Sequence, residues 1–186
     1  MNLTDEEKKF LISIARNSII ASLEKNKESK LSIPSNPVYH SKCGAFVTLT
    51  CNDNLRGCIG YIISEKPLHK TISDSARHAA FEDPRFSPIA KEELPDIKIE
   101  ISILSEPFPM KDYEDIEIGK HGLILEEPRR ALLLPQVPIE HSMDREQFLS
   151  ALCRKAGLYS NYWKETKLKI SLFTATVFSE KDWESK

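Results

Sequence analysis

Glycine is scarce in this chain, and long hydrophobic runs are absent from it. Only 6 of the 186 residues are glycine, and no stretch approaches the roughly 18 apolar residues of a membrane-spanning helix. The first nine residues include Asp5, Glu6 and Glu7 and lack the basic and then hydrophobic pattern of a secretion signal. These absences predict a cytoplasmic protein with no membrane segment.

Cysteine is also sparse, and its spacing matches no metal-binding motif. The four cysteines, Cys43, Cys51, Cys58 and Cys153, include no Cys-x2-Cys pair of the kind found in zinc sites. In the cytoplasm such cysteines stay reduced. The histidines show no four-residue spacing on a predicted helix, and the chain has no Gly-x-Gly-x-x-Gly or P-loop motif. We therefore expect no built-in metal site, and the sequence identifies no cofactor.

Neither sign of charge dominates the composition. The chain has 26 Lys and Arg residues against 28 Asp and Glu residues, a formal net charge of -2. Because nucleic-acid-binding domains usually carry a basic surplus, a nucleic-acid partner is not expected. The length favours one domain over residues 1–186, and a chain of this size can build a core without disulfides.

Helical and alternating hydrophobic patterns are both present. The capping-box pair Thr4 and Glu7 begins a helix, and the isoleucines of residues 97–103 alternate with polar residues as in a half-buried strand. The predicted helices cover residues 4–25, 67–82 and 144–156, and the predicted strands cover 44–51, 55–63, 97–103, 131–134 and 168–178, with two short strands within 116–125. Because the strands come as hairpins and isolated pieces, we predict an α+β domain with a mostly antiparallel sheet.

The most unusual segment is the hexapeptide 55–60, Leu-Arg-Gly-Cys-Ile-Gly. A glycine within a strand usually marks a bulge or a close approach of backbone or ligand, so Gly57 and Gly60 are expected to be backbone features. In an extended strand Arg56 and Cys58 point to the same face, and a nearby cation lowers the pKa of a thiol. Cys58 is therefore a candidate nucleophile. The alternative is a small core cysteine, since free cysteines are often buried.

Arg56 has two interpretations as well. Its planar guanidinium could hold a carboxylate or phosphate group, or it could form a structural ion pair with Asp83, Glu100 or another acid, because its charge must be compensated. The Asp-Pro-Arg-Phe segment that contains Asp83 and Arg85 breaks the preceding helix. Its two charged residues could line a pocket. The alternative is a local Asp83–Arg85 pair, with the phenylalanine in the core.

A second polar loop, residues 119–122 (Gly-Lys-His-Gly), places Lys120 and His121 between glycines. A histidine titrates near neutral pH and can transfer protons. His121, or His78 in the second predicted helix, is therefore a candidate partner of Cys58 in thiol-based catalysis. The alternative is an ordinary hairpin loop in which Lys120 and His121 are solvated.

Together these motifs resemble the AMMECR-type domain family, whose bacterial and archaeal members are called AmmeMemoRadiSam system protein A. The resemblance extends from about Phe10 to Phe178, and the hexapeptide is its most specific element. The other matching segments are 44–49, 83–86, 99–102, 118–122, 134–137 and 155–158. The resemblance implies an antiparallel sheet with flanking helices, two unequal subdomains, and a cleft near the hexapeptide.

Two functions follow from the motifs and the resemblance. The first is a small-molecule-handling enzyme or a component of a modification system, in which Cys58 is a nucleophile or covalent tether and His121 moves protons. The expected binding residues are Arg56, Gly57, Gly60, Asp83, Arg85, Glu100 and Lys120. The resemblance implies a Memo-like protein and a radical SAM enzyme as partners. The second function is a non-catalytic binding or adaptor module in which Cys58 only packs.

Overall fold

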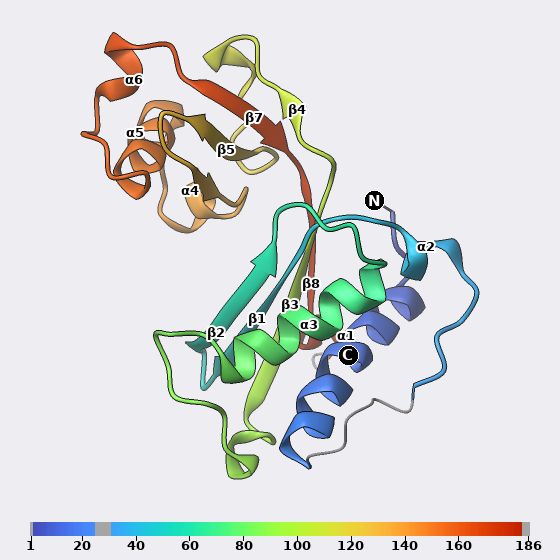
Figure 1. Ribbon diagram of the computed structural model, residues 1–186. Helices are drawn as coiled ribbons and strands as arrows, with labels where there is room; N and C mark the ends of the chain where they lie inside the picture. Colours follow the sequence, from blue (N-terminus) through green and yellow to red (C-terminus); the bar gives the residue numbers. More distant parts are fainter. Residues whose placement is uncertain (1, 25–30, 184–186) are drawn as a thin grey trace. The chain divides into compact units, whose positions relative to one another are not determined.

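The computed structural model describes residues 2–24 and 31–183, and these residues fold into two compact units. Unit 1 is formed by the part of the chain before residue 105 together with the segment that follows residue 175. Unit 2 is formed by Ser105–Ala175. Each unit has a four-stranded antiparallel sheet and its own helices (Figure 1). The predicted α+β class is therefore confirmed, with two sheets in place of one.

The sheet of unit 1 has the strand order β2-β1-β3-β8. Its two long helices, α1 and α3, pack against each other and against the same face of this sheet (Figure 1). The elements of unit 1 are α1 (Asp5–Leu23), α2 (Pro37–His40), β1 (Ala45–Cys51), β2 (Asn54–Tyr61), α3 (Leu68–Phe81), η1 (Lys91–Glu93), β3 (Ile97–Leu104), β8 (Ala175–Ser179) and η3 (Glu180–Trp183).

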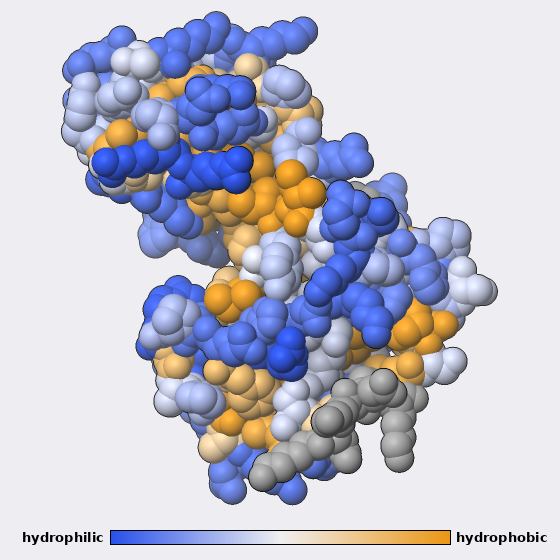
Figure 2. Space-filling model, in the orientation of Figure 1, coloured by the Kyte–Doolittle hydropathy of each residue, from blue (hydrophilic) through white to orange (hydrophobic). Residues whose placement is uncertain are grey.

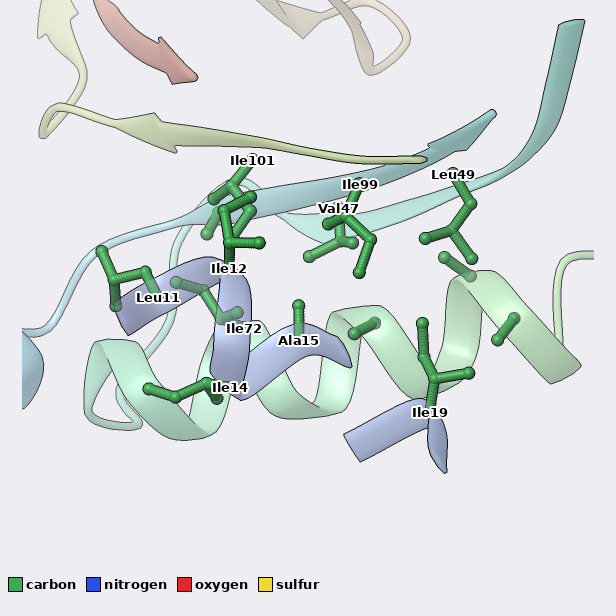
Figure 3. Packing of buried hydrophobic residues seen from close by; sticks show 14 of the residues in the cluster. Leu11, Ile12, Ile14, Ala15, Ile19, Val47, Leu49, Ile72, Ile99 and Ile101 are labelled. Carbon is green, nitrogen blue, oxygen red and sulfur yellow. The ribbon is translucent and has the colours of Figure 1, made fainter. Parts of the chain in front are cut away.

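The core of unit 1 follows directly from the periodicity of the sequence. The predicted capping box begins α1, with the Glu7 amide donating to Thr4 Oγ1 and the Thr4 amide donating to a carboxylate oxygen of Glu7. Leu11 and Ala15 on α1 are fully buried in the same cluster as strand residues such as Ile99, and Ala15 points toward the sheet (Figure 3). The hydrophobic side of each strand therefore faces the helices, and the polar side faces away from them.

Strand pairing aligns three polar residues on the face of the sheet opposite α1 and α3. Thr48 on β1 is the register partner of Cys58 on β2 and also of Glu100 on β3. Their chain neighbours Val47 and Ile99 belong to the core, so alternation turns Thr48, Cys58 and Glu100 to the other face. We call this row of three residues the polar row.

Unit 2 has the strand order β4-β7-β5-β6. Its core joins the sheet to α5, whose Phe148 and Leu152 are fully buried. The elements are β4 (Phe108–Pro109), η2 (Tyr113–Asp115), β5 (Gly122–Glu127), β6 (Ala131–Leu133), α4 (Val137–Glu140), α5 (Arg145–Lys155), α6 (Tyr162–Glu165) and β7 (Lys169–Phe173).

Two predicted elements differ from the structure. The segment 168–178 is not one strand, because β7 ends at Phe173 in the sheet of unit 2 and β8 begins at Ala175 in the sheet of unit 1. The segment 116–125 holds one strand, β5, which begins at Gly122, and turns precede it. Among the other predictions, the helix over 4–25 is confirmed up to its cap at Glu24, and Lys25 lies outside the described residues.

The surface of both units is largely hydrophilic in the view of Figure 2. Hydrophobic residues that are exposed occur in each unit, Ile63 in unit 1 and Ile139 in unit 2 being the most exposed. Within the described parts of the chain, every helix is too short or too polar to span a membrane.

Candidate functional site

Cys58 lies on β2, the edge strand of the unit 1 sheet, and is half-buried. On the side toward β1, the hydroxyl of Thr48 donates a hydrogen bond to Cys58 Sγ over 3.4 Å. Glu100 follows on the far side of Thr48 in the same row. The thiol therefore lies on a polar sheet face, between a hydroxyl and the outer edge of the sheet.

The outer edge of β2 is covered at Cys58 by two side chains. Asp83 Oδ2 accepts a hydrogen bond from the Cys58 amide over 2.9 Å, and Arg85 Nη2 donates to the Cys58 carbonyl over 3.4 Å. These side chains occupy the hydrogen-bonding positions that a further strand would fill. The two segments singled out in the sequence, 55–60 and 83–86, therefore meet at Cys58.

Asp83 and Arg85 also form a bidentate ion pair. Arg85 Nε lies 2.9 Å from Asp83 Oδ1, and Arg85 Nη2 lies 2.7 Å from Asp83 Oδ2. The Asp83 side chain is only 2% exposed. The hydrogen bonds from the Arg85 guanidinium hold the pKa of the Asp83 carboxyl far below its usual range, with further help from the Cys58 and Arg85 amides and against the effect of burial. Asp83 therefore stays ionised throughout the physiological range.

This ion pair leads to a prediction about acid stability. The pKa of Asp83 is lower in the folded protein than the unfolded value of about 3.9. Its contribution is therefore complete above about pH 4 and is lost as the pH falls below that value. We expect Asp83→Asn to lower the free energy of unfolding by about 2 kcal/mol at pH 6, allowing for the solvent exposure of Arg85. The difference from wild type, measured by urea unfolding, should shrink between pH 4 and pH 2.5, and a constant difference would contradict the assignment.

Arg56 forms the structural pair that was its alternative interpretation, with Glu93 as the acid. Arg56 Nε lies 2.7 Å from Glu93 Oε1, Nη2 lies 3.1 Å from Glu93 Oε2, and Nη1 donates to the Ser87 carbonyl over 2.8 Å. The Arg56 guanidinium lowers the pKa of Glu93, with further help from the Ala90 amide. Arg56 thus ties the segment 82–93 to β2 at a second point.

The two glycines of the hexapeptide are required by close packing, as expected. A Cβ atom on Gly57 would lie 2.1 Å from the backbone oxygen of Ala79 on α3, and one on Gly60 would lie 2.4 Å from the Ala45 oxygen. Gly57 therefore lets α3 approach the sheet at the strand position next to Cys58.

The two candidate histidines belong to other elements of the fold. His78 on α3 places Nδ1 3.1 Å from the Tyr61 hydroxyl, and α3 covers the face of the sheet opposite the polar row. His121 belongs to unit 2, where it is buried and its Nδ1 lies 3.1 Å from the Asp115 carbonyl and 3.2 Å from the Glu117 amide. The expectation of a solvated His121 in a hairpin loop is therefore wrong. Because His121 and Cys58 belong to different units, their pairing stays a prediction.

Lys120 is exposed in unit 2 and binds Glu117, with its Nζ 2.8 Å and 2.9 Å from the two carboxylate oxygens. Gly119, which precedes it, has a φ of +83°. This left-handed conformation favours glycine and turns the chain ahead of β5. Whether Lys120 binds a ligand stays a prediction.

A family model described as AMMECR1 matches residues 12–178. The chain belongs to the AMMECR1 family. Protein MK0488 of Methanopyrus kandleri is 42% identical, over 97% of this chain and 91% of its own length. Protein LS215_2104 of Saccharolobus islandicus is 41% identical, over 96% of this chain and 83% of its own length.

The fold is also similar to a solved structure. The crystal structure of the uncharacterized protein PH0010 from Pyrococcus horikoshii superimposes with a TM-score of 0.86 and 36% sequence identity, covering 96% of this chain and 94% of that one. The resemblance inferred from the motifs is therefore confirmed at the level of family and fold.

Two residues of this candidate site were not singled out in the sequence. Thr48 lies in the matching segment 44–49, and the alternation of β1 puts it on the polar face. Its pairing with Cys58 depends on the strand register, which has a bulge between Leu49 and Thr50. Glu93 carries no local signal at all, because it lies 37 positions from Arg56 in the chain.

The other cysteines provide an internal comparison. Cys153 is fully buried in the core of unit 2, and Cys43 packs against the core of unit 1. Burial raises the pKa of both thiols. In the described part of the chain, no three or more His, Cys, Asp or Glu side chains are placed to hold a metal ion.

Proposed function

We propose that this protein binds a small anionic molecule beside Cys58, and that the Cys58 thiol acts on it as a nucleophile or covalent tether. The observation that carries the proposal is the convergence of segments 55–60 and 83–86 on Cys58. Both backbone groups of Cys58 are bound by Asp83 and Arg85, while its sulfur remains half-buried on a polar face. A core cysteine such as Cys153 has no such surroundings.

Arg85 is the residue best suited to hold the anion. Its side chain is 53% exposed, and among the described residues none accepts a hydrogen bond from its Nη1. Its orientation is fixed by the bidentate contact with Asp83 and by stacking over the Phe86 ring at 5.4 Å. A planar guanidinium of this kind recognises carboxylate and phosphate groups. Arg56, at 15% exposure and bound through all three nitrogens, is less available.

Thiol labelling tests this proposal on the intact protein. With iodoacetamide at pH 7.5, we expect Cys58 to be modified about tenfold faster than Cys153, which is buried, and Cys43, which is partly buried against the core. Cys51 is the matched control, because it is half-buried but has no such arginine contact. Peptide mass spectrometry gives the four rates in one sample. Labelling of Cys58 no faster than of Cys51 would exclude a reactive thiol.

The same assay tests the anion site. Millimolar phosphate or acetate should slow the labelling of Cys58 without changing the rate at Cys51. Arg85→Gln should abolish this protection. Equal protection in wild type and Arg85→Gln would remove Arg85 as the anchor while leaving the reactivity of Cys58 intact.

We also propose that the protein acts in the cytoplasm, together with a Memo-like protein and a radical SAM enzyme. It is supported by the match to the AMMECR1 family and by the resemblance of the motifs to AmmeMemoRadiSam system protein A. If Cys58 acts on a molecule supplied or consumed by these partners, the Cys58→Ser variant should still co-purify with them but should no longer form product.

A second candidate function is an adaptor module in which Cys58 is structural. One observation favours it: Arg56, Gly57 and Gly60 of the hexapeptide each have a structural contact that explains their presence. If the protein is an adaptor, the Cys58→Ala variant should bind its partners as well as the wild-type protein does, because partner binding is then the whole function.

A further inference from the structure

Asp83 lies where it can influence the position and reactivity of the Cys58 thiol without contacting a ligand. Its carboxylate is 2% exposed and so lies away from solvent. It accepts hydrogen bonds from the amides of Cys58 and Arg85, and from two nitrogens of the Arg85 guanidinium. Both carboxylate oxygens of Asp83 thus bind the two residues assigned to the site.

We propose that Asp83 is a positioning residue that fixes Cys58 and sets its reactivity by compensating the positive charge of Arg85. The inference rests on the proposed function, since it takes Cys58 to be the reactive thiol. It changes the role expected of Asp83, from a ligand-binding residue to one that acts through Cys58 and Arg85.

Hydrogen bonds hold both the backbone and the sulfur of Cys58. The Cys58 amide is held by Asp83 and the carbonyl by Arg85, while Thr48 holds the sulfur. Three separate contacts therefore fix one residue on an edge strand, where a backbone without a neighbouring strand would otherwise be bound only by water.

Charged side chains also surround Cys58. At the outer edge these are Arg85 and Asp83. On the sheet they are Arg56 of β2, which is paired with Glu93 of η1, and Lys98 and Glu100 of β3. Arg85 is the cation in contact with Cys58, through the Cys58 backbone oxygen. The hydrogen bonds to Asp83 are the main cause of the raised pKa of Arg85, and Cys58 adds a smaller contribution. An unpaired cation at this position would stabilise the thiolate more strongly than the paired one does, and Asp83 limits this stabilisation.

The test is the pH profile of Cys58 labelling. In Asp83→Asn, Arg85 keeps its charge without a counter-ion, so the apparent pKa of labelling should fall by about one unit. In the double variant Asp83→Asn with Arg85→Gln, the profile should return toward that of the wild type. Arg85→Gln alone leaves the Asp83 carboxylate uncompensated 2.9 Å from the Cys58 amide, so the apparent pKa should rise.

Glu93→Gln is the control for loosening of the segment 82–93. It weakens the second attachment of that segment, at Arg56, and should shift the profile of Cys58 far less than Asp83→Asn does, because Arg85 and not Arg56 contacts the Cys58 backbone. An equal shift in Glu93→Gln and Asp83→Asn, or no shift in Asp83→Asn, would overturn the inference. If Asp83→Asn fails to fold, the rise expected in Arg85→Gln decides the question. Failure of the proposed function would show differently, as an unreactive Cys58 in the wild-type protein.

Discussion

Gly57→Ala is expected to destabilise unit 1 by about 3 kcal/mol, the upper part of the range for forced overpacking. The new methyl group would lie 2.1 Å from the Ala79 oxygen and 3.0 Å from the Ala79 carbonyl carbon. Both are backbone atoms of α3, so no side chain can rotate away. The helix must move from the sheet, and the buried alanines around Ala79 must lose contact with it.

The two tryptophans allow the measurement to be confined to unit 1. Trp183 packs against the core of unit 1 and Trp163 against that of unit 2. In a Trp163→Phe background, urea unfolding followed by Trp183 fluorescence reports on unit 1. Full wild-type stability in Gly57→Ala would contradict the close packing of α3 on β2.

Gly119→Ala in unit 2 is the matched control for replacing a glycine, and its unfolding is followed by Trp163 fluorescence in a Trp183→Phe background. Its Cβ would meet only the side chain of Ile139, at 3.0 Å, which can move. The cost there is the left-handed backbone, about 1 kcal/mol. A larger loss in Gly119→Ala than in Gly57→Ala would mean that backbone conformation, and not packing, decides these positions.

Elements whose signals are local could be predicted from the sequence. The capping residues Thr4 and Glu7 mark the beginning of α1, and the alternating isoleucines mark β3, because each signal depends on neighbours a few positions away. The division of segment 168–178 between two sheets could not be predicted. The residues on both sides of Thr174 are typical of a strand, and the sequence does not show that their partner strands belong to different sheets.

The same distinction applies to the site. Alternation along β2 predicts that Arg56 and Cys58 share one face, although the strand register skips Arg56 at a bulge. Alternation does not show that Arg56 forms an ion pair with Glu93. Nor does it show that Asp83 and Arg85, 25 and 27 positions away, bind the backbone of Cys58. These contacts depend on where the segment 82–93 runs after α3, which local patterns do not specify.

A further long-range contact, between Arg16 on α1 and Glu180 on η3, gives the second large expected effect. Arg16 Nε lies 2.7 Å from Glu180 Oε1, and Nη2 lies 2.6 Å from Oε2. Arg16 Nη2 also donates to the Ile97 carbonyl over 2.7 Å, and Glu180 accepts from the Ile99 amide over 2.9 Å. This network joins α1, β3 and η3.

Glu180→Ala should lower the free energy of unfolding of unit 1 by about 3 kcal/mol, because it leaves the partly buried Arg16 without its counter-ion and the Ile99 amide without an acceptor. Urea unfolding followed by Trp183 fluorescence measures the loss. Glu180→Gln is the control, since its side-chain oxygen can still accept from Ile99. It should lose about half as much, reflecting the charge alone. Equal losses in the two variants would show that the hydrogen bond to β3 contributes nothing. Glu180→Gln keeps the hydrogen bond to β3, the strand that carries Glu100 of the polar row. We therefore expect Cys58 to be labelled at the same rate in Glu180→Gln as in the wild-type protein.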